Sequence, residues 1–220
     1  NQGIGRLTAV QDASGILGYS YDARGNLVEQ LRSVDVNGSD QFDHLGYAYD
    51  GANQLSRIDY PVGLSVLYPR NAAGQVTQVH LQVGSNPPSS LASAIAYLPF
   101  GPLKSLTWGN GVSLNRSYDQ DYRLIEQSVA GWNSAYEYDA NSNITALNSN
   151  LLGNLAYTYD ALDRLTAEDK ADRQQTYSYD AVGNRTGKSS TPIINGEEQT
   201  GTQQTYQYAG NSNRLMQIDA

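Results

Sequence analysis

Six Tyr-x-Tyr pairs recur along the chain, and five of them are followed at once by aspartate. The pairs are Tyr19/Tyr21, Tyr47/Tyr49, Tyr136/Tyr138, Tyr157/Tyr159, Tyr177/Tyr179 and Tyr206/Tyr208, and the aspartates are Asp22, Asp50, Asp139, Asp160 and Asp180. Ala209 takes the aspartate position after the last pair. Two degenerate copies keep part of the pattern, Tyr68-Pro69-Arg70-Asn71 and Arg116-Ser117-Tyr118-Asp119. From Asp119 to Asp180 the aspartates are 20, 21 and 20 residues apart. A period of about twenty residues is typical of a repeat architecture.

The residues after each aspartate predict a hairpin turn. Two variable residues follow, and then one that usually tolerates a positive φ; these residues are Gly25, Asn53, Gly74, Asp163 and Gly183, with Ser142 and Tyr122 as exceptions. Aspartate at the first position of a turn accepts backbone N–H bonds, and glycine or asparagine adopts the left-handed conformation. Residues n and n+2 of a strand share one face, so each pair places two phenol rings side by side. Each unit is therefore predicted to be strand, tight turn, strand.

Composition favours the same fold class. Tyrosine accounts for 17 of the 21 aromatic residues, glycine is abundant at 21 residues, and charged residues make up only 16% of the chain. Tyrosine suits pleated strands, whereas glycine, asparagine and aspartate interrupt helices. A single hairpin is marginally stable in water, so neighbouring hairpins are expected to stack. We predict an all-β fold, with hairpins stacked into one long twisted sheet.

The repeat pattern indicates one domain over residues 1–220. Three polar segments interrupt it, and we expect them to be loops, near residues 34–43, 84–93 and 187–204. The same repeat resumes after each of them, so none is interpreted as a linker between domains.

Several function classes are excluded by composition. The chain has no cysteine and only two histidines, His44 and His80, so cysteine-based metal sites and thiol chemistry are excluded. The net charge of −8 opposes binding to nucleic acid. No stretch approaches the roughly 20 apolar residues of a membrane-spanning helix. The sequence predicts no cofactor and no metal.

The repeat units YSYDARGNL, YAYDGANQL, YEYDANSNI, YTYDALDRL and YSYDAVGNR resemble the YD repeats of the Rhs family. This family comprises bacterial polymorphic toxins and their relatives, the toxin-complex C subunits and the teneurins. The segment from Tyr97 to Leu124 is similar to a stretch that recurs in one bacterial branch of the family. With no methionine at residue 1, the chain is interpreted as a piece of a longer polypeptide.

The resemblance implies a β-sheet that spirals into a hollow shell around a C-terminal toxin or effector. Its expected partners are the remaining shell repeats and the toxin of the same polypeptide, together with a bacterial secretion system that delivers or secretes it. The family's self-cleaving core has no counterpart here, so we predict no catalytic residue and no enzyme activity. The expected structural residues are Tyr19, Tyr21, Asp22, Gly25, Tyr47, Tyr49, Asp50, Tyr136, Tyr138, Asp139, Tyr157, Tyr159, Asp160, Tyr177, Tyr179, Asp180 and Gly183.

The recurring aspartates have two chemical interpretations. As paired carboxylates they could serve acid–base catalysis, but a turn-closing role explains both their type and their spacing. The segment from Asp139 begins like a calcium loop, yet Ile144 and Asn150 stand where an EF-hand needs glycine and glutamate. Weak calcium binding between repeats and a hydrolytic carboxylate site remain as alternatives.

A second function class is surface recognition. Stacked phenol rings can hold sugars, so the tyrosines could instead form an adhesion or carbohydrate-binding module at the cell surface. Unpaired sheet edges also lead us to expect self-association of the isolated chain.

Overall fold

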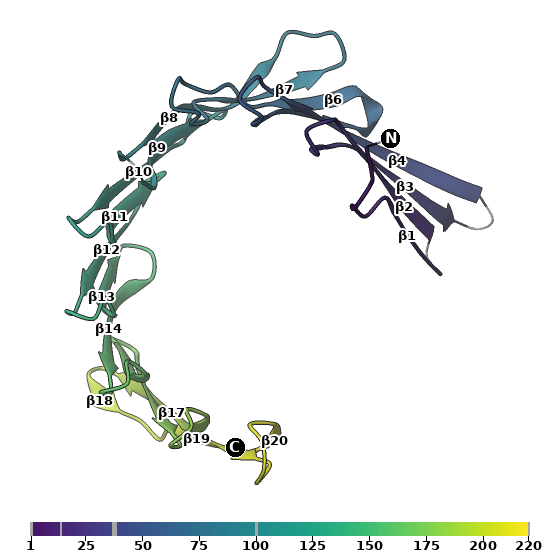
Figure 1. Cartoon of the computed structure of the whole chain (residues 1–220). Helices are drawn as coiled ribbons and strands as arrows, with labels where there is room; N and C mark the ends of the chain where they lie inside the picture. The colour runs from purple at the N-terminus through teal and green to yellow at the C-terminus, as the bar shows by residue number, and fades with distance from the viewer. Residues whose placement is uncertain (1, 14, 37–38, 100, 220) are drawn as a thin grey trace. The chain divides into compact units, whose positions relative to one another are not determined.

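The computed structural model describes residues 2–13, 15–36, 39–99 and 101–219. The chain divides into two compact units, Asn1–Ser113 and Leu114–Ala220. Both units are built from antiparallel strands that follow one another in chain order (Figure 1). The all-β class and the stacking of hairpins are therefore confirmed within each unit.

The first unit is a meander in which each strand pairs with the next. One turn of 3-10 helix, η1 (Pro61–Gly63), lies between the fifth and sixth strands. The strands are β1 (Ala9–Asp12), β2 (Gly15–Tyr21), β3 (Leu27–Val36), β4 (Ser39–Tyr49), β5 (Leu55–Tyr60), β6 (Leu64–Leu67), β7 (Val79–Val83), β8 (Ser89–Tyr97) and β9 (Leu103–Trp108).

The second unit is also a meander. Its strands pair in sequence, except that β17 pairs with both β18 and β19. They are β10 (Ser113–Tyr118), β11 (Leu124–Val129), β12 (Trp132–Tyr138), β13 (Ile144–Ser149), β14 (Gly153–Tyr159), β15 (Leu165–Lys170), β16 (Arg173–Tyr179), β17 (Arg185–Ile194), β18 (Glu197–Glu198), β19 (Thr202–Tyr208) and β20 (Leu215–Asp219).

The hairpin register is the same from repeat to repeat. The second tyrosine of a pair lies opposite the first strand residue after the turn, as Tyr138 lies opposite Ile144 and Tyr159 opposite Leu165. In each case the register shifts by one residue immediately before the tyrosine. An extra residue next to a tight turn increases the local twist. A shared turn chemistry thus gives every hairpin the same register.

The described residues contain very little fully buried core. Ala92 and Leu114 are their only buried hydrophobic residues, and Ser65, Ser134 and Ser149 are the buried polar ones. None of the large side chains that the structure describes is fully enclosed. Most tyrosines are half-buried, so the contacts between adjacent strands must supply most of the stabilisation.

The three loop predictions were largely wrong. Residues 34–36 and 39–43 belong to β3 and β4, and residues 37–38 lie outside the described part of the chain. Only residues 84–88 of the second segment connect strands, because β8 begins at Ser89. Most of residues 187–204 lies in β17, β18 and β19. These polar residues still form strands because their backbone groups pair across hairpins, and exposed strand positions accept polar side chains.

No helix in the described ranges is long and apolar enough to cross a membrane.

Candidate functional site: the tyrosine face and the turn edge

The second tyrosine of each pair links its repeat to the preceding one. Its hydroxyl donates to a backbone carbonyl at or just before the start of the neighbouring strand. The bonds run from Tyr21 to Leu7 (2.7 Å), Tyr49 to Leu27 (2.9 Å), Tyr138 to Leu124 (2.7 Å), Tyr159 to Ile144 (2.8 Å), Tyr179 to Leu165 (2.8 Å) and Tyr208 to Arg185 (3.0 Å). All six acceptors occupy the same position, the first residue after the turn exit.

The first tyrosines of the pairs lie on the same face but bond differently. Tyr177 Oη donates to Gln175 Oε1 at 2.9 Å, and Gln127 Nε2 donates to Tyr136 Oη at 3.4 Å. The Tyr157 hydroxyl bonds none of the described residues, and Tyr19 and Tyr47 are half-buried on β2 and β4. Burial raises the pKa of Tyr157 and Tyr177 above the ordinary value. These rings therefore act mainly through packing.

Each turn aspartate closes its turn through one carboxylate oxygen. Asp160 Oδ1 accepts from the backbone N–H of Leu162 (2.9 Å) and Arg164 (3.0 Å), and Asp160 N donates to the carbonyl of Arg164 (3.0 Å). The same pair of carboxylate contacts occurs at Asp22, Asp50, Asp119, Asp139 and Asp180, and Asn71 makes it with its amide oxygen. The aspartates lie at successive turns and are not gathered around a cleft.

The fourth turn residue is left-handed in every one of these turns. Gly25 (φ 91°) and Gly183 (φ 92°) have it, as expected for glycine. Ser142 (φ 70°) and Tyr122 (φ 62°) also adopt it, although the sequence marked them as exceptions. The aspartate contacts hold this conformation even where the residue does not favour it, at a cost of about 1 kcal/mol or more.

Hydrogen bonds within the turn lower the pKa of several aspartates. The side-chain amides of Asn26, Asn143 and Asn184 donate to the second carboxylate oxygens of Asp22, Asp139 and Asp180 at 2.8–3.0 Å and lower their pKa values. At Asp160 the backbone N–H of Arg164 is the main cause of the lowered pKa. These carboxylates stay ionised at neutral pH and accept hydrogen bonds.

Arginine at the turn exit forms a second link between repeats, which sequence analysis missed. Arg123 and Arg164 pair with their own turn aspartates at 2.7 Å, and their guanidinium carbons lie 4.9 and 4.8 Å from the ring centres of Tyr138 and Tyr179. Arg6 lies 5.5 Å above Tyr21 in the same way. The fifteen-residue spacing between each arginine and its tyrosine was the signal in the sequence. A cation over a phenol ring adds about 0.5–1 kcal/mol at an exposed site.

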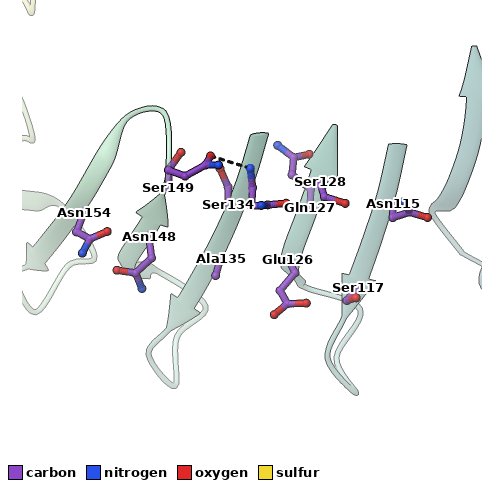
Figure 2. A pocket seen from close by; sticks show the side chains of 12 residues that line it. Asn115, Ser117, Glu126, Gln127, Ser128, Ser134, Ala135, Asn148, Ser149 and Asn154 are labelled. Carbon is purple, nitrogen blue, oxygen red and sulfur yellow. Dashed lines mark hydrogen bonds between the residues drawn. The ribbon is translucent and has the colours of Figure 1, made fainter. Parts of the chain in front are cut away.

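The face opposite the tyrosines carries a polar pocket in the second unit. Its volume is about 530 Å³, and its lining comes from β10 to β14 (Figure 2). Ser117, Glu126, Ala135, Asn148 and Asn154 face one another strand by strand across it. Because Ala135 precedes Tyr136, this row projects from the face opposite that ring. The pocket offers amides, hydroxyls and one carboxylate, which suit hydrogen bonding and not proton relay.

The two histidines and the acidic residues do not assemble a metal centre in the described ranges. No group of three or more histidine, aspartate or glutamate side chains converges there. His44 Nε2 lies 2.9 Å from Glu29 Oε1 on a neighbouring strand, and His80 Nε2 lies 2.9 Å from Gln78 Oε1. Asp139, the first residue of the segment that resembles a calcium loop, instead accepts hydrogen bonds from the backbone N–H groups of its own turn.

A family model and several solved structures are similar to this chain. The RHS Repeat model matches residues 3–40 and 159–192. The crystal structure of TcdB2-TccC3-TEV superposes with a TM-score of 0.83 at 16% identity, covering 96% of this chain and 13% of that one. TcdB2-TccC3 without its hypervariable C-terminal region gives the same values.

The Photorhabdus luminescens Tc holotoxin pore with a TccC3 mutation gives a TM-score of 0.81 at 16% identity, with coverage of 96% and 12%. The chain thus spans about an eighth of the length of these structures. None of the curated proteins matches the chain. The similarity to the solved structures establishes the fold.

Proposed function

We propose that this chain, which carries RHS repeats and has the fold of a Tc toxin shell, is a wall segment that encloses a C-terminal toxin or effector. The remaining shell repeats and the toxin would belong to the same polypeptide. A bacterial secretion system would secrete or deliver the assembled protein. Containment, and not catalysis, would be the contribution of this segment.

The observation that carries the proposal is the regular bonding between repeats. Six tyrosine hydroxyls connect one hairpin to the next at equivalent atoms. Such contacts join each hairpin to its neighbour along the sheet without converging on a reaction centre. Repeat proteins of this kind gain stability from nearest-neighbour interfaces, which suits a wall better than a pocket.

Protease protection within the full-length gene product tests this proposal. We expect the segment downstream of the repeats to resist a protease that rapidly digests the same segment expressed alone. Replacing Tyr138, Tyr159 and Tyr179 together with phenylalanine should loosen the wall and raise the digestion rate. Tyr157→Phe, which removes a hydroxyl without a described partner, is the matched control. Equal digestion of the enclosed and free segments would contradict containment.

Glycan recognition at a cell surface is the second candidate, and the polar pocket of Figure 2 favours it. Asn148 and Asn154 present amide groups of the type that bind sugar hydroxyls. A glycan array with the isolated chain tests this candidate, and Asn148→Ala should abolish any signal. A blank array would leave the shell as the proposal, while sedimentation of the same sample would test the expected self-association.

A further inference from the structure

The residue at each turn exit contacts the next turn along the sheet. We call Arg6, Asn26, Gln54, Arg123, Asn143, Arg164 and Asn184 the exit residues; each follows the left-handed position of its own turn. Across from them, in the next turn, lie Gly25, Asn53, Gly74, Ser142, Asp163, Gly183 and Asn213. The two lists pair in order, and the pairs fall into two chemical kinds.

Asparagine exits meet a side-chain oxygen. Asn26 Nδ2 donates to Asn53 Oδ1 at 2.5 Å, and Asn143 Nδ2 donates to Asp163 Oδ1 at 2.7 Å. Asn184 Nδ2 donates to Asn213 Oδ1 at 3.2 Å. Each of these amides also donates to the aspartate of its own turn. Both N–H bonds of the amide are then used, one inside the turn and one to the neighbour.

Exit residues with long side chains, arginine and glutamine, lie against a residue with little or no side chain. A Cβ atom on Gly25 would collide with Nη2 of Arg6, and one on Gly74 would lie 2.6 Å from Nε2 of Gln54. At these two turns the exit side chains of Arg6 and Gln54 therefore fill the volume that a larger neighbour would need. Where the exit is asparagine, the shorter side chain leaves that volume to Asn53, Asp163 or Asn213.

The two internal arginine exits find their acceptor on the main chain. Arg123 Nη1 donates to the carbonyl of Asp139 at 3.2 Å and to Ser142 Oγ at 3.2 Å. Arg164 Nη1 donates to the carbonyl of Asp180 at 3.0 Å, and a Cβ on Gly183 would meet nothing within 4 Å. These arginines therefore require no side-chain oxygen from the next turn. The contacted positions there hold only small residues, Ser142 and Gly183.

We propose that this pairing is a recognition rule that decides which repeat can lie next to which. An asparagine exit selects a neighbour with asparagine or aspartate at the contacted position, and an arginine or glutamine exit selects glycine or serine. All seven of these pairs obey the rule. The partner of each turn edge is thus another repeat of matched kind. The rule concerns the order of repeats and is independent of what the sheet encloses.

A double-mutant cycle at Gln54 and Gly74 tests the rule in the intact chain. Gly74→Asn alone should lower the melting temperature because Gln54 occupies its space, and Gln54→Asn alone leaves an amide without its acceptor. Together they recreate the pair formed by Asn26 and Asn53. The double variant should melt about 2–4 °C above the value obtained by adding the two single shifts.

The reverse cycle uses Asn26→Gln and Asn53→Gly, which should couple with the same sign. Two controls accompany the cycles. Asp163→Asn keeps the acceptor and should leave the melting temperature unchanged, and Gln54→Asn combined with Gly183→Asn joins different turns and should be additive. Additive shifts in both cycles would overturn the rule. If a single variant does not fold, recovery of the β-sheet circular dichroism signal in the double variant supports the rule, and no recovery overturns it.

Discussion

Removal of one hydroxyl, in Tyr159→Phe, is the sharpest test of how the repeats are held together. The Tyr159 ring is half-buried on β14, and its hydroxyl donates to the Ile144 carbonyl of the neighbouring strand at 2.8 Å. Phenylalanine retains the ring and its packing. The substitution therefore removes the inter-repeat hydrogen bond and leaves a partly buried carbonyl without this donor.

The expected loss follows from the energetics of such bonds. A net intramolecular hydrogen bond contributes about 0.5–1.5 kcal/mol, and the unpaired carbonyl places the loss near the middle of that range or above. For a chain of this size, about 1 kcal/mol corresponds to a fall of about 2–4 °C in melting temperature. Equivalent tyrosines lie two strands apart, roughly 10 Å, so losses at Tyr138, Tyr159 and Tyr179 should be nearly additive.

Thermal and urea unfolding of Tyr159→Phe measured beside Tyr157→Phe gives the decisive comparison. Tyr157 lies on the same strand and face, and its hydroxyl bonds none of the described residues. We expect Tyr157→Phe to change the free energy of unfolding by less than about 0.5 kcal/mol. Equal losses in the two variants, or no loss in Tyr159→Phe, would refute the view that these hydroxyls hold neighbouring repeats together.

Three further predictions concern the turns and the pH dependence. Asp180→Ala removes the acceptor of three turn hydrogen bonds and should lower the free energy of unfolding by about 1–2 kcal/mol. Asp180→Asn should lower it less, because the Asn71 side chain closes an equivalent turn in this chain. The urea midpoints of the two variants make the comparison. Val62 has φ 61° in η1 and is 91% exposed, so Val62→Asn should raise the melting temperature by about 2–4 °C, and a fall would show that the valine side chain makes a stabilising contact. The lowered pKa of turn aspartates such as Asp139 implies stability that is present above their unfolded pKa near 4 and is lost as the pH falls further. The raised pKa of the half-buried Tyr159 implies stability that is lost as the pH rises above about 10. Unfolding measured from pH 2 to 11 should show both losses, and a flat acid limb would contradict the aspartate contacts.

The repeat unit itself could be predicted because its causes are local. Tyrosines two residues apart share a strand face, and Asp160 closes a turn with backbone groups two and four residues ahead. The loop predictions were wrong for a related reason. Polarity at residues 187–204 predicted a loop, but backbone pairing across a hairpin does not depend on side-chain polarity. The half-buried residues 187–191 of β17 and the exposed residues 202–203 of β19 therefore both form strands.

The sequence by itself determined the hairpin, its turn and the identity of the repeated residues, since each depends on neighbours within about five positions. Only the tertiary structure decided what lies between repeats: that Tyr159 reaches the carbonyl of Ile144, that Arg164 lies over the ring of Tyr179, and that Asn143 meets Asp163. These contacts join residues 15–20 positions apart, and their partners are set by strand register, which exists only once neighbouring hairpins have paired.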